Sequence, residues 1–497
     1  MTIPFVRFTF LSAFLPLIAA CVAVGPDYQK PIVSMPARWN AKTGTAVPRL
    51  GDWWKNLNDP VLDQLITDGI AGSPDVAIAK AKVRQARASY AYAGGSLYPS
   101  LDGSGSYTRS HTAGSSSRSE ISSQSHTSSQ SKFGFDTKWE LDLFGGNLRG
   151  AEAAYYSLES ADERLRDALV ALIGDIATNY VQLRGTQANI AIAQRNAASQ
   201  RQTVALTRNK LAAGDISRLD LLNAEALAAS TEAQIPTMRI QYAGYLNTLS
   251  VLTGISTTAL ASMLDRPRPI PVAPSKVAVE LPAELLLNRP DVRAAERDYA
   301  SSTAQIGQKQ AALYPGISLS GDIGTGGTRL GDIARMSTIG WSFGPSLSIP
   351  IFQGGRLNAD VALAKAQRDE SFVAYRKAIL QALSDVENAS VSLNQNRLRY
   401  IQLQKAARSS RQANTLALEL YKAGSNSFLQ VLTAQRDLLS AETSLTQSRA
   451  DLVVSYVTLQ KALGGGWNGR VDASKPEIVD GYTGPHLVKT GIPDRPS

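Results

Sequence analysis

Cysteine and histidine are almost absent from this chain of 497 residues, which has one cysteine and three histidines. A single cysteine cannot form an intrachain disulfide, and so few of these residues argue against a metal site built from them. A Ser-His-Asp catalytic site would have to use His111, His126 or His486. Two of these lie in a Ser-rich stretch and one in a Gly/Pro-rich tail. We therefore expect no catalytic residues and no metal.

Charge of one sign is not concentrated anywhere in the sequence. The formal net charge is +9, but lysine and arginine are interspersed with acidic residues, unlike the basic patch of a nucleic-acid-binding protein. Hydrophobic residues make up 43% of the chain, and the mean hydropathy is −0.13. These values exclude a disordered protein and a bundle of membrane-spanning helices. The length alone would allow about three ordinary domains.

The first 20 residues have the pattern of an export signal. Arg7 precedes an apolar run from Phe8 to Ala20, which is too short for a membrane-spanning helix and fits the core of a signal peptide. The run ends in Leu-Ile-Ala-Ala before Cys21, which resembles a bacterial lipobox. That resemblance implies cleavage before Cys21 and acylation of this cysteine. An ordinary signal peptide followed by a chance cysteine is the alternative.

The rest of the sequence contains two copies of one unit. Residues 73–76 (Ser-Pro-Asp-Val) recur as 289–292 (Arg-Pro-Asp-Val), an offset of 216 residues. Residues 145–148 (Gly-Gly-Asn-Leu) recur as 354–357 (Gly-Gly-Arg-Leu), an offset of 209 residues. Ordered matches of this kind indicate a duplicated unit of about 210 residues, well above the period of solenoid repeats.

Each copy contains segments with the alternation of a β-strand. From Lys132 to Phe144, mostly apolar residues alternate with mostly charged ones, which predicts a strand with one apolar and one charged face. A milder alternation runs from Ile339 to Ile351, and an earlier strand is expected in each copy, at 101–107 and 317–323. Soluble sandwiches also alternate in this way. The charged face and the length, however, suit strands that cross a membrane around a water-filled lumen.

Long helices follow the Gly-Gly of each copy. Residues 356–423 contain neither glycine nor proline, and a helix of that length would extend for ~100 Å. Ile379, Leu383, Val386 and Leu393 have heptad spacing. Their face is therefore expected to pack on a neighbouring helix, as in a plain coiled coil.

Glycines mark the points where the long helices turn back. Gly214 and Gly424 are expected to end the descending helices in the left-handed conformation. Pro236 lies in the return helix of the first copy and predicts a kink or an interruption there. The candidates for capping the return helices are Asp215, Ser217, Ser425 and Ser427.

Four strands per chain are too few to close a barrel in a membrane, because such barrels need at least about eight strands and no open edge. Two chains would supply eight strands and three would supply twelve. An eight-stranded barrel is filled by its own side chains, whereas more strands enclose an aqueous channel. The charged strand face favours the channel.

Several motifs resemble a known family. Residues 21–28 (Cys-Val-Ala-Val-Gly-Pro-Asp-Tyr), Trp53-Trp54 before Asp59-Pro60, and residues 289–296 (Arg-Pro-Asp-Val-Arg-Ala-Ala-Glu) are similar to the TolC-like outer-membrane efflux factors, specifically their NodT-type lipoprotein branch. With the duplication, the resemblance covers nearly the whole mature chain.

This resemblance implies a mixed α and β membrane protein, a homotrimer with a 12-stranded β-barrel that continues into a long periplasmic α-helical barrel of coiled-coil hairpins. It implies a passive exit duct of a tripartite efflux system in the bacterial outer membrane. A periplasmic adaptor and an inner-membrane pump would supply docking and energy. No enzymatic activity, no nucleic-acid partner and no cofactor beyond the N-terminal lipid are implied.

The duplication and the resemblance together divide the chain into eight segments. They are a signal peptide (1–20), a lipid-anchored segment with the first equatorial helices (21–95), a first β-hairpin (96–145), a first helical hairpin (146–255), a linker with equatorial helices (256–312), a second β-hairpin (313–353), a second helical hairpin (354–463) and a C-terminal tail (464–497).

The resemblance also implies a gate at the periplasmic tip, where the helices turn. In the family, acids ring the pore there, but the second copy has Gln430 and Thr433 at positions where acids are common. Asp220 could supply a weaker ring or could merely cap the return helix, and Leu429 or Leu432 could form a hydrophobic constriction. The gate candidates are Asp220, Asn223, Leu429, Gln430 and Thr433, and the candidates for adaptor docking are Gly214, Asp215, Gly424 and Ser425.

Other functions remain open from the sequence. They are a lipid-anchored coiled coil without a pore, a TolC-like duct for protein secretion, a lipoprotein hydrolase, and the adaptor protein of the same pump. The coiled coil would leave the two-faced strands unexplained, and adaptors usually have one helical hairpin rather than two. Neither the exported substrates nor the class of pump follows from the sequence.

Overall fold

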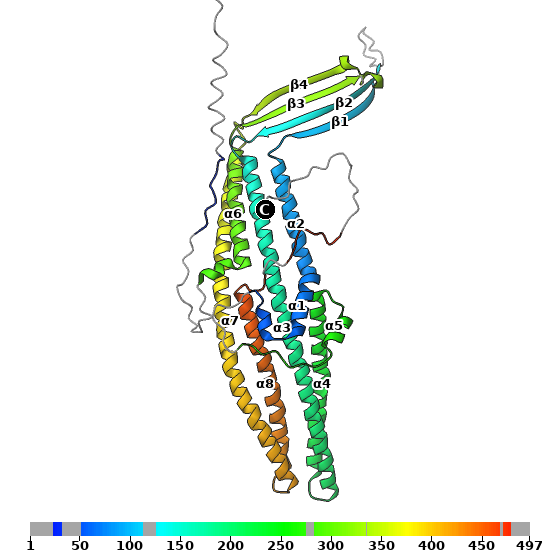
Figure 1. Ribbon diagram of the computed structural model, residues 1–497, viewed down its shortest axis with the longest axis vertical. Coiled ribbons are helices and arrows are strands. Elements are labelled where there is room, and N and C mark those ends of the chain that lie inside the picture. Colours follow the sequence, from blue (N-terminus) through cyan, green and yellow to red (C-terminus); the bar gives the residue numbers. More distant parts are fainter. Residues whose placement is uncertain are drawn as a thin grey trace, which may run out of the picture.

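The structure is a computed structural model that describes residues 23–31, 51–112, 126–274, 283–333, 335–467 and 471–478. Within these ranges the molecule is long and thin, with a β-sheet at one end and two helical hairpins at the other (Figure 1). Cys21 and the expected signal peptide lie outside the described residues, as do part of the Ser-rich connection and most of the C-terminal tail.

The four strands form one antiparallel sheet in the order β1-β2-β3-β4. The strands are β1 (Ser100–Thr112), β2 (His126–Leu141), β3 (Gly316–Gly327) and β4 (Ile339–Ser348). Pairing of β2 with β3 joins the hairpin of one copy to that of the other. β1 and β2 extend further into the Ser-rich segment than the alternation predicted, because their side chains bond across the ladder. Ser110 and Ser128 hydroxyls lie 2.8 Å apart.

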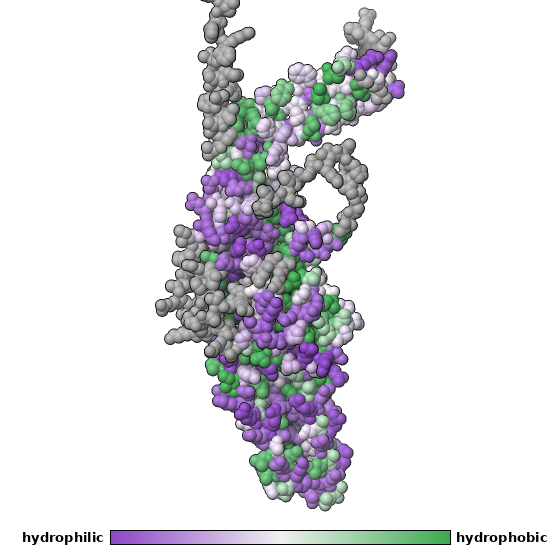
Figure 2. Space-filling model, in the orientation of Figure 1, coloured by the Kyte–Doolittle hydropathy of each residue, from purple (hydrophilic) through white to green (hydrophobic). Residues whose placement is uncertain are grey.

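The two faces of the sheet differ in chemistry, as the alternation predicted. Phe133 and Phe135 of β2 lie on one face, and Asp136 lies on the other. The register places Asp136 directly opposite Asp102 of β1 and Asp322 of β3. Hydrophobic residues are prominent on the sheet in Figure 2, whereas hydrophilic residues cover much of the helical part.

Two pairs of helices form the hairpins, α3 (Gly146–Ala212) with α4 (Arg218–Thr253) and α7 (Arg356–Lys422) with α8 (Phe428–Ala462). α3 and α7 are each 67 residues long, so each extends for about 100 Å. Pro236 lies inside α4 without interrupting it, so the interruption that we allowed for does not occur. The apolar contacts of the hairpin keep α4 helical despite the missing backbone hydrogen bond, which still lowers its stability.

Shorter helices surround the middle of the molecule. They are η2 (Trp53–Leu57), α1 (Pro60–Gly72), α2 (Pro74–Gly95), α5 (Thr257–Leu264), η3 (Ala283–Asn288) and α6 (Pro290–Ala311), whereas η4 (Leu330–Asp332) and η5 (Met336–Thr338) lie in the connection between β3 and β4. A proline at the first position starts α1, α2 and α6, where its missing N–H has no intrahelical partner to lose. Trp53, Leu62, Ile173, Tyr180 and Tyr456 are fully buried in the main apolar cluster of this region. None of the described helices is long and apolar enough to cross a membrane.

α3 lies at the centre of the helical part. It packs against α4 and α8, and also against α2 and α6, while α7 packs against α8 and α6 (Figure 1). α7 therefore forms one edge of the molecule, and α2 with α4 forms the other. Exposed apolar side chains lie along both edges, such as Leu380 on α7 and Ile240 on α4. In the described chain, β1 and β4 each pair on one side only, so both ends of the sheet are also open to further chains.

Candidate functional site

Both hairpins turn at the tip through the same hydrogen-bonding motif. Gly214 has a φ of +79° and Gly424 a φ of +77°, which is the left-handed conformation that favours glycine. The N–H of Asp215 bonds the Lys210 carbonyl at 2.9 Å, and the N–H of Ser425 bonds the carbonyl five residues before it at 2.9 Å. This is the Schellman arrangement, which satisfies the last carbonyls of a helix.

Asp220 has a clear structural role in the first hairpin. Ser217 Oγ accepts from the Asp220 N–H at 3.3 Å, and Asp220 Oδ2 accepts from the Ser217 N–H at 3.3 Å. This reciprocal pair is a capping box, which stabilises the start of α4. Of the two roles considered for Asp220, a ring of acids around the pore or a cap of the return helix, its side chain performs the second within one chain. Asn223, one turn further along α4, is half-buried.

The candidates from the second hairpin lie on the first turns of α8. Leu429 is 66% exposed, and Gln430 and Thr433 are also exposed. The Thr433 hydroxyl donates to the Leu429 carbonyl at 2.9 Å. Leu432, the other apolar candidate for a constriction, is instead buried. Of the two apolar candidates, therefore, only Leu429 is exposed within one chain, and Leu219 and Leu222 are exposed at the corresponding positions of the first hairpin.

Leu432 belongs to a group of buried apolar residues that joins the two hairpins, which we call the tip cluster. Tyr421 of α7 and Phe428 of α8 pack with ring centroids 5.6 Å apart. The cluster consists of Ala224, Leu227, Tyr421, Phe428, Val431 and Leu432. Because Ala224 and Leu227 come from α4, the tip cluster holds the second hairpin against the first.

Two charged groups of the first hairpin also act on Tyr421, which is 3% exposed. The Lys210 ammonium lies 5.2 Å from the centroid of its ring, within the range of a cation–π interaction. The Tyr421 hydroxyl has no hydrogen-bond partner among the described residues. Burial raises the pKa of Tyr421, and the negative charge of Asp220 raises it further.

Our sequence reasoning did not single out Tyr421 or Lys210. A comparison of the two copies would have offered one signal. At an offset of 210 residues, Tyr421 corresponds to Leu211, so only the second copy carries an aromatic residue at this point of the turn. The partner of that ring, however, comes from a segment about half the chain away, which a sequence pattern does not reveal.

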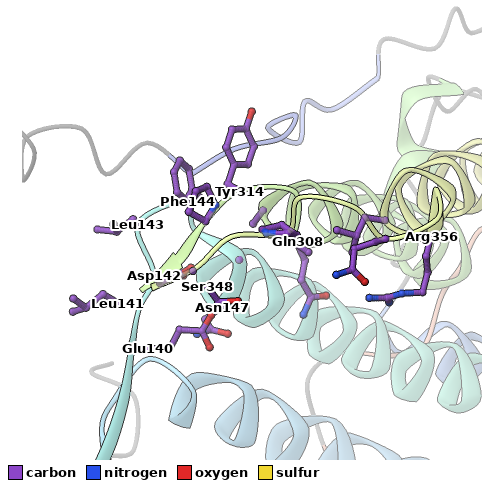
Figure 3. A pocket seen from close by; sticks show the side chains of 18 residues that line it. Glu140, Leu141, Asp142, Leu143, Phe144, Asn147, Gln308, Tyr314, Ser348 and Arg356 are labelled. Atoms are coloured by element: carbon purple, nitrogen blue, oxygen red, sulfur yellow. The ribbon is translucent and has the colours of Figure 1, made fainter. Parts of the chain in front are cut away.

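A second notable feature is a hollow of about 430 Å³ where the strands meet the long helices. In Figure 3, the side chains of Leu141 and Leu143 point to one side, away from Gln308 and Arg356, which also line the hollow. Asp142 Oδ2 accepts from the Leu148 N–H at 2.7 Å, which secures the first turn of α3. The two-faced character of β2 therefore continues into the strand–helix junction.

The segment from Ala23 to Pro31, which we call the N-terminal strap, lies against this junction and the helices below it. The Val24 N–H bonds the Phe144 carbonyl at 3.0 Å, in the junction between β2 and α3. The buried Arg149 of α3 donates to Asp27 Oδ1 at 2.5 Å. The strap therefore places Val24, which follows Cys21 by three residues in the sequence, beside the junction of β2 and α3.

The far part of the N-terminal strap contacts α6. The Tyr28 hydroxyl donates to Glu296 Oε1 at 2.7 Å, and the Lys30 ammonium lies 3.5 Å from Glu296 Oε2. Burial and the bond to Glu296 raise the pKa of Tyr28. The motifs of the family drew attention to Asp27, Tyr28 and Glu296, but not to Arg149 and not to the pairing of these side chains.

Comparison with known proteins decides what this arrangement belongs to. The sequence profile of the outer membrane efflux protein family matches residues 65–255 and 281–465, one segment in each copy. The chain belongs to the outer membrane efflux protein family. Nodulation protein T of Rhizobium leguminosarum bv. trifolii is 34% identical over 467 residues, which cover 93% of this chain and 98% of that protein. The toluene efflux pump outer membrane protein TtgI of Pseudomonas putida is 32% identical, over 93% of this chain and 99% of that protein.

The fold agrees with a solved structure. The structure of the outer-membrane channel OprN is similar with a TM-score of 0.81 and 32% sequence identity, and the match covers 89% of this chain and 99% of that one. This confirms the predicted fold class, in which three chains each contribute four strands to one barrel above a helical tube.

Family membership also confirms the predicted function. The protein is the outer-membrane channel of a tripartite efflux system and is not an enzyme. It lies in the bacterial outer membrane as a homotrimer, and its partners are a periplasmic adaptor and an inner-membrane pump. Channels of this family do not depend on a cofactor. The alternatives of a pore-free coiled coil, a hydrolase and an adaptor are therefore set aside.

Proposed function

We propose that this efflux channel is anchored through an acylated Cys21 and that the tip cluster holds its periplasmic end closed. The single observation that carries the closure is the position of Tyr421. This residue belongs to the second hairpin, yet its ring lies against Lys210 of the first and packs in the cluster that contains α4. The hairpins cannot separate at the tip without exposing that ring.

The boundaries predicted for the eight segments and the roles of the exposed tip residues are part of the same proposal. Leu429, Gln430 and Thr433 are exposed in one chain, so they are available to the other chains around the pore or to an adaptor. Asp220 is committed to its capping box, but its carboxylate still raises the pKa of Tyr421. Gly214, Asp215, Gly424 and Ser425 form the two turns that an adaptor would meet first.

Single-channel conductance of the purified trimer in a planar lipid bilayer tests the closure. Tyr421→Ala removes the ring contacts with Phe428 and Lys210, and we expect at least about a tenfold rise in open probability, because loss of a buried aromatic ring costs about 3–5 kcal/mol. Tyr421→Phe keeps the ring and removes only a hydroxyl without a partner, so the channel should stay closed.

Tyr400→Ala is the matched control, since Tyr400 lies on the same helix and outside the tip cluster. It should leave the open probability unchanged. If Tyr421→Ala conducts like the unmodified trimer, the tip cluster does not close the pore. If Tyr421→Phe opens the channel as strongly as Tyr421→Ala, the Tyr421 hydroxyl rather than the ring contacts keeps the channel closed. That result would contradict closure by the tip cluster.

Mass spectrometry of the mature N-terminus tests the anchor. An acylated Cys21 would place its lipid beside the membrane boundary, because the N-terminal strap fixes Val24 at the junction between β2 and α3. We expect diacylglycerol on the Cys21 thiol and, in Cys21→Ser, loss of both the lipid and the cleavage before residue 21. A mature chain that begins at another residue, or an unmodified Cys21 thiol, would contradict anchoring through Cys21.

A further inference from the structure

One face of the sheet carries no charge over most of the height of the strands. On β2 it comprises every second residue from Phe133 to Leu141, and the residues paired with these on β1 and β3 are also uncharged. Trp341 and Phe343 of β4 belong to the same face and are 76% and 66% exposed. The aspartates lie on the opposite face. The uncharged face is therefore the lipid-facing band of the barrel, because the lumen is the polar side.

The charge changes at the free end of the sheet, which is the exterior end of the channel. Among the described residues of 107–112, 126–131 and 326–338, three are arginines and one is acidic. We call Arg109, Arg329 and Arg335 the arginine collar. Neither the Arg109 nor the Arg329 side chain has an ion pair or a hydrogen bond with any part of the chain that the structure describes. Figure 2 shows hydrophilic residues at this end of the sheet, beyond the hydrophobic ones.

Two arginines of the collar flank β2 at one level. Arg109 of β1 lies opposite Ser129. Ser131 lies opposite Gly327, so Arg329, two residues beyond Gly327, comes level with Ser129 as well. Neighbouring strands are ~4.8 Å apart, and the backbones of the two arginines are therefore about 10 Å apart. Arg109 continues the lipid-facing positions of β1, because side chains alternate between the faces.

The connection between β3 and β4 brings Arg329 and Arg335 to the same side of the sheet. A Cβ atom on Gly327, which continues the lipid-facing positions of β3, would lie 2.4 Å from the Asp332 Cβ. The connection thus folds over the lipid-facing side. Asp332 Oδ2 accepts from the Arg329 N–H at 3.0 Å, and the Arg335 guanidinium lies 3.4 Å from Asp332 Oδ1. The Thr338 hydroxyl donates to the Asp332 carbonyl at 2.7 Å, so one turn around Asp332 holds this part of the collar.

The collar lies at the depth of the lipid headgroups. From Leu141 to Ser131, β2 advances by ten residues, which span about 26 Å of the membrane at ~3.4 Å per residue and a tilt of ~40°. The apolar band of such barrels is ~25 Å tall. Tyr107 lies opposite Ser131 and marks the border, as tyrosines do at a membrane interface. Arg109 and Arg329 follow two residues further out, in the headgroup layer.

We propose that the arginine collar binds the phosphates of a phosphorylated glycolipid in the outer leaflet of the membrane, one lipid at each chain of the trimer. A guanidinium group binds phosphate through two parallel N–H···O bonds, and those of Arg109 and Arg329 are not used within the chain. Two such groups on backbones about 10 Å apart fit a headgroup that carries two phosphates on one sugar unit. The binding is continuous with the lipid-facing band and depends neither on the tip closure nor on acylation of Cys21.

Native mass spectrometry of the purified trimer with diphosphorylated lipid A tests this proposal. We expect up to three bound lipids per trimer. In Arg109→Gln/Arg329→Gln the affinity should fall at least about tenfold, because a hydrogen bond to a charged group contributes at least as much as a tenfold change in affinity. Lipid A without its phosphates should bind the unmodified trimer as weakly. Arg218→Gln is the matched control, since Arg218 is an exposed arginine at the helical tip, and it should bind like the unmodified trimer.

The lysine variant Arg109→Lys/Arg329→Lys separates charge from damage to the barrel. It keeps both charges and loses the paired bonds, so its affinity should lie between those of the unmodified trimer and the glutamine variant. All variants should unfold at the same temperature in lipid-free detergent, because the replaced side chains have no partner within the described chain. A loss in the lysine variant as large as in the glutamine variant would assign the effect to an altered barrel and overturn the proposal.

Three other results would also overturn it. They are unchanged affinity of the glutamine variant for diphosphorylated lipid A, equal binding of the form without phosphates, and equal binding of phosphatidylglycerol. The last result would show attraction to any anionic lipid rather than recognition of a headgroup with two phosphates.

Discussion

Gly25 of the N-terminal strap and Gly307 of α6 approach so closely that a Cβ atom on Gly25 would lie 2.3 Å from the Gly307 Cα. Gly25 has a φ of +99°, which residues with a side chain rarely adopt. A Cβ on Gly307 would in turn lie 2.7 Å from the Val24 carbonyl oxygen. The backbone contact between strap and helix therefore depends on both glycines.

Gly307→Ala should displace the N-terminal strap. The new methyl group would collide with backbone, which cannot rotate away, so we expect a loss of about 1–3 kcal/mol in the free energy of unfolding. Thermal unfolding of the detergent-solubilised trimer measures the loss, and faster proteolysis within residues 23–31 locates it. Gly94→Ala on α2 is the control, because nothing lies within 4 Å of a Cβ there. Equal behaviour of the two variants would contradict a strap held by close contact.

Substitutions of Gly424 should rank by their tolerance of positive φ. Gly424 has a φ of +77°. Glycine adopts this left-handed conformation readily, asparagine less readily, and alanine least readily of the three. We expect Gly424→Ala to lose about 1 kcal/mol of stability and Gly424→Asn to lose less. Differential hydrogen exchange at the second tip turn reports the effect locally. The same loss in both variants would argue against the left-handed conformation as its cause.

Pro236→Ala should stabilise α4. Alanine restores a backbone N–H that can bond the carbonyl of Glu232, and proline in a helix interior is about 3 kcal/mol less favourable than alanine. Thermal unfolding measures the gain. Thr446→Ala is the control at the equivalent position of α8, where only the hydroxyl bond to the Glu442 carbonyl is lost. No gain in Pro236→Ala would mean that the hairpin already compensates for the proline.

The stability of the protein should depend on the ionisation of Asp63 in α1. Burial raises the pKa of the Asp63 carboxyl, and the charge of Asp59 raises it further against the opposing effect of Lys55. The folded chain thus binds this proton more readily than the unfolded chain. The stability that Asp63 contributes when protonated is lost as the pH rises from the ordinary aspartate pKa of about 3.9 through the raised folded value.

Asp63→Asn removes that titration. It should be more stable than the unmodified protein at neutral pH, and the difference should shrink as the pH falls toward about 4. Thermal unfolding across this range gives the comparison. A difference that stays constant with pH would show that the amide acts through packing rather than through charge.

Much of the architecture follows from local patterns in the sequence. Alternation along Lys132–Phe144 predicts a two-faced strand because side chains point to opposite faces at every step. The long stretch without glycine or proline predicts α7 because nothing in it interrupts backbone hydrogen bonding. Gly424 predicts the turn because few other residues adopt a positive φ. Each of these signals is contained within a few adjacent residues.

The partners of the functional side chains were decided only by the tertiary structure. Tyr421 meets Lys210, Arg149 meets Asp27, and Gln435 meets Thr203, in each case across more than a hundred residues of chain. Such pairs depend on which helices become neighbours and on how these helices are aligned along their axes. Packing of the whole hairpin sets both. The sequence by itself therefore determined the strands, helices, turns and family, whereas the contacts between side chains far apart in the chain required the folded structure.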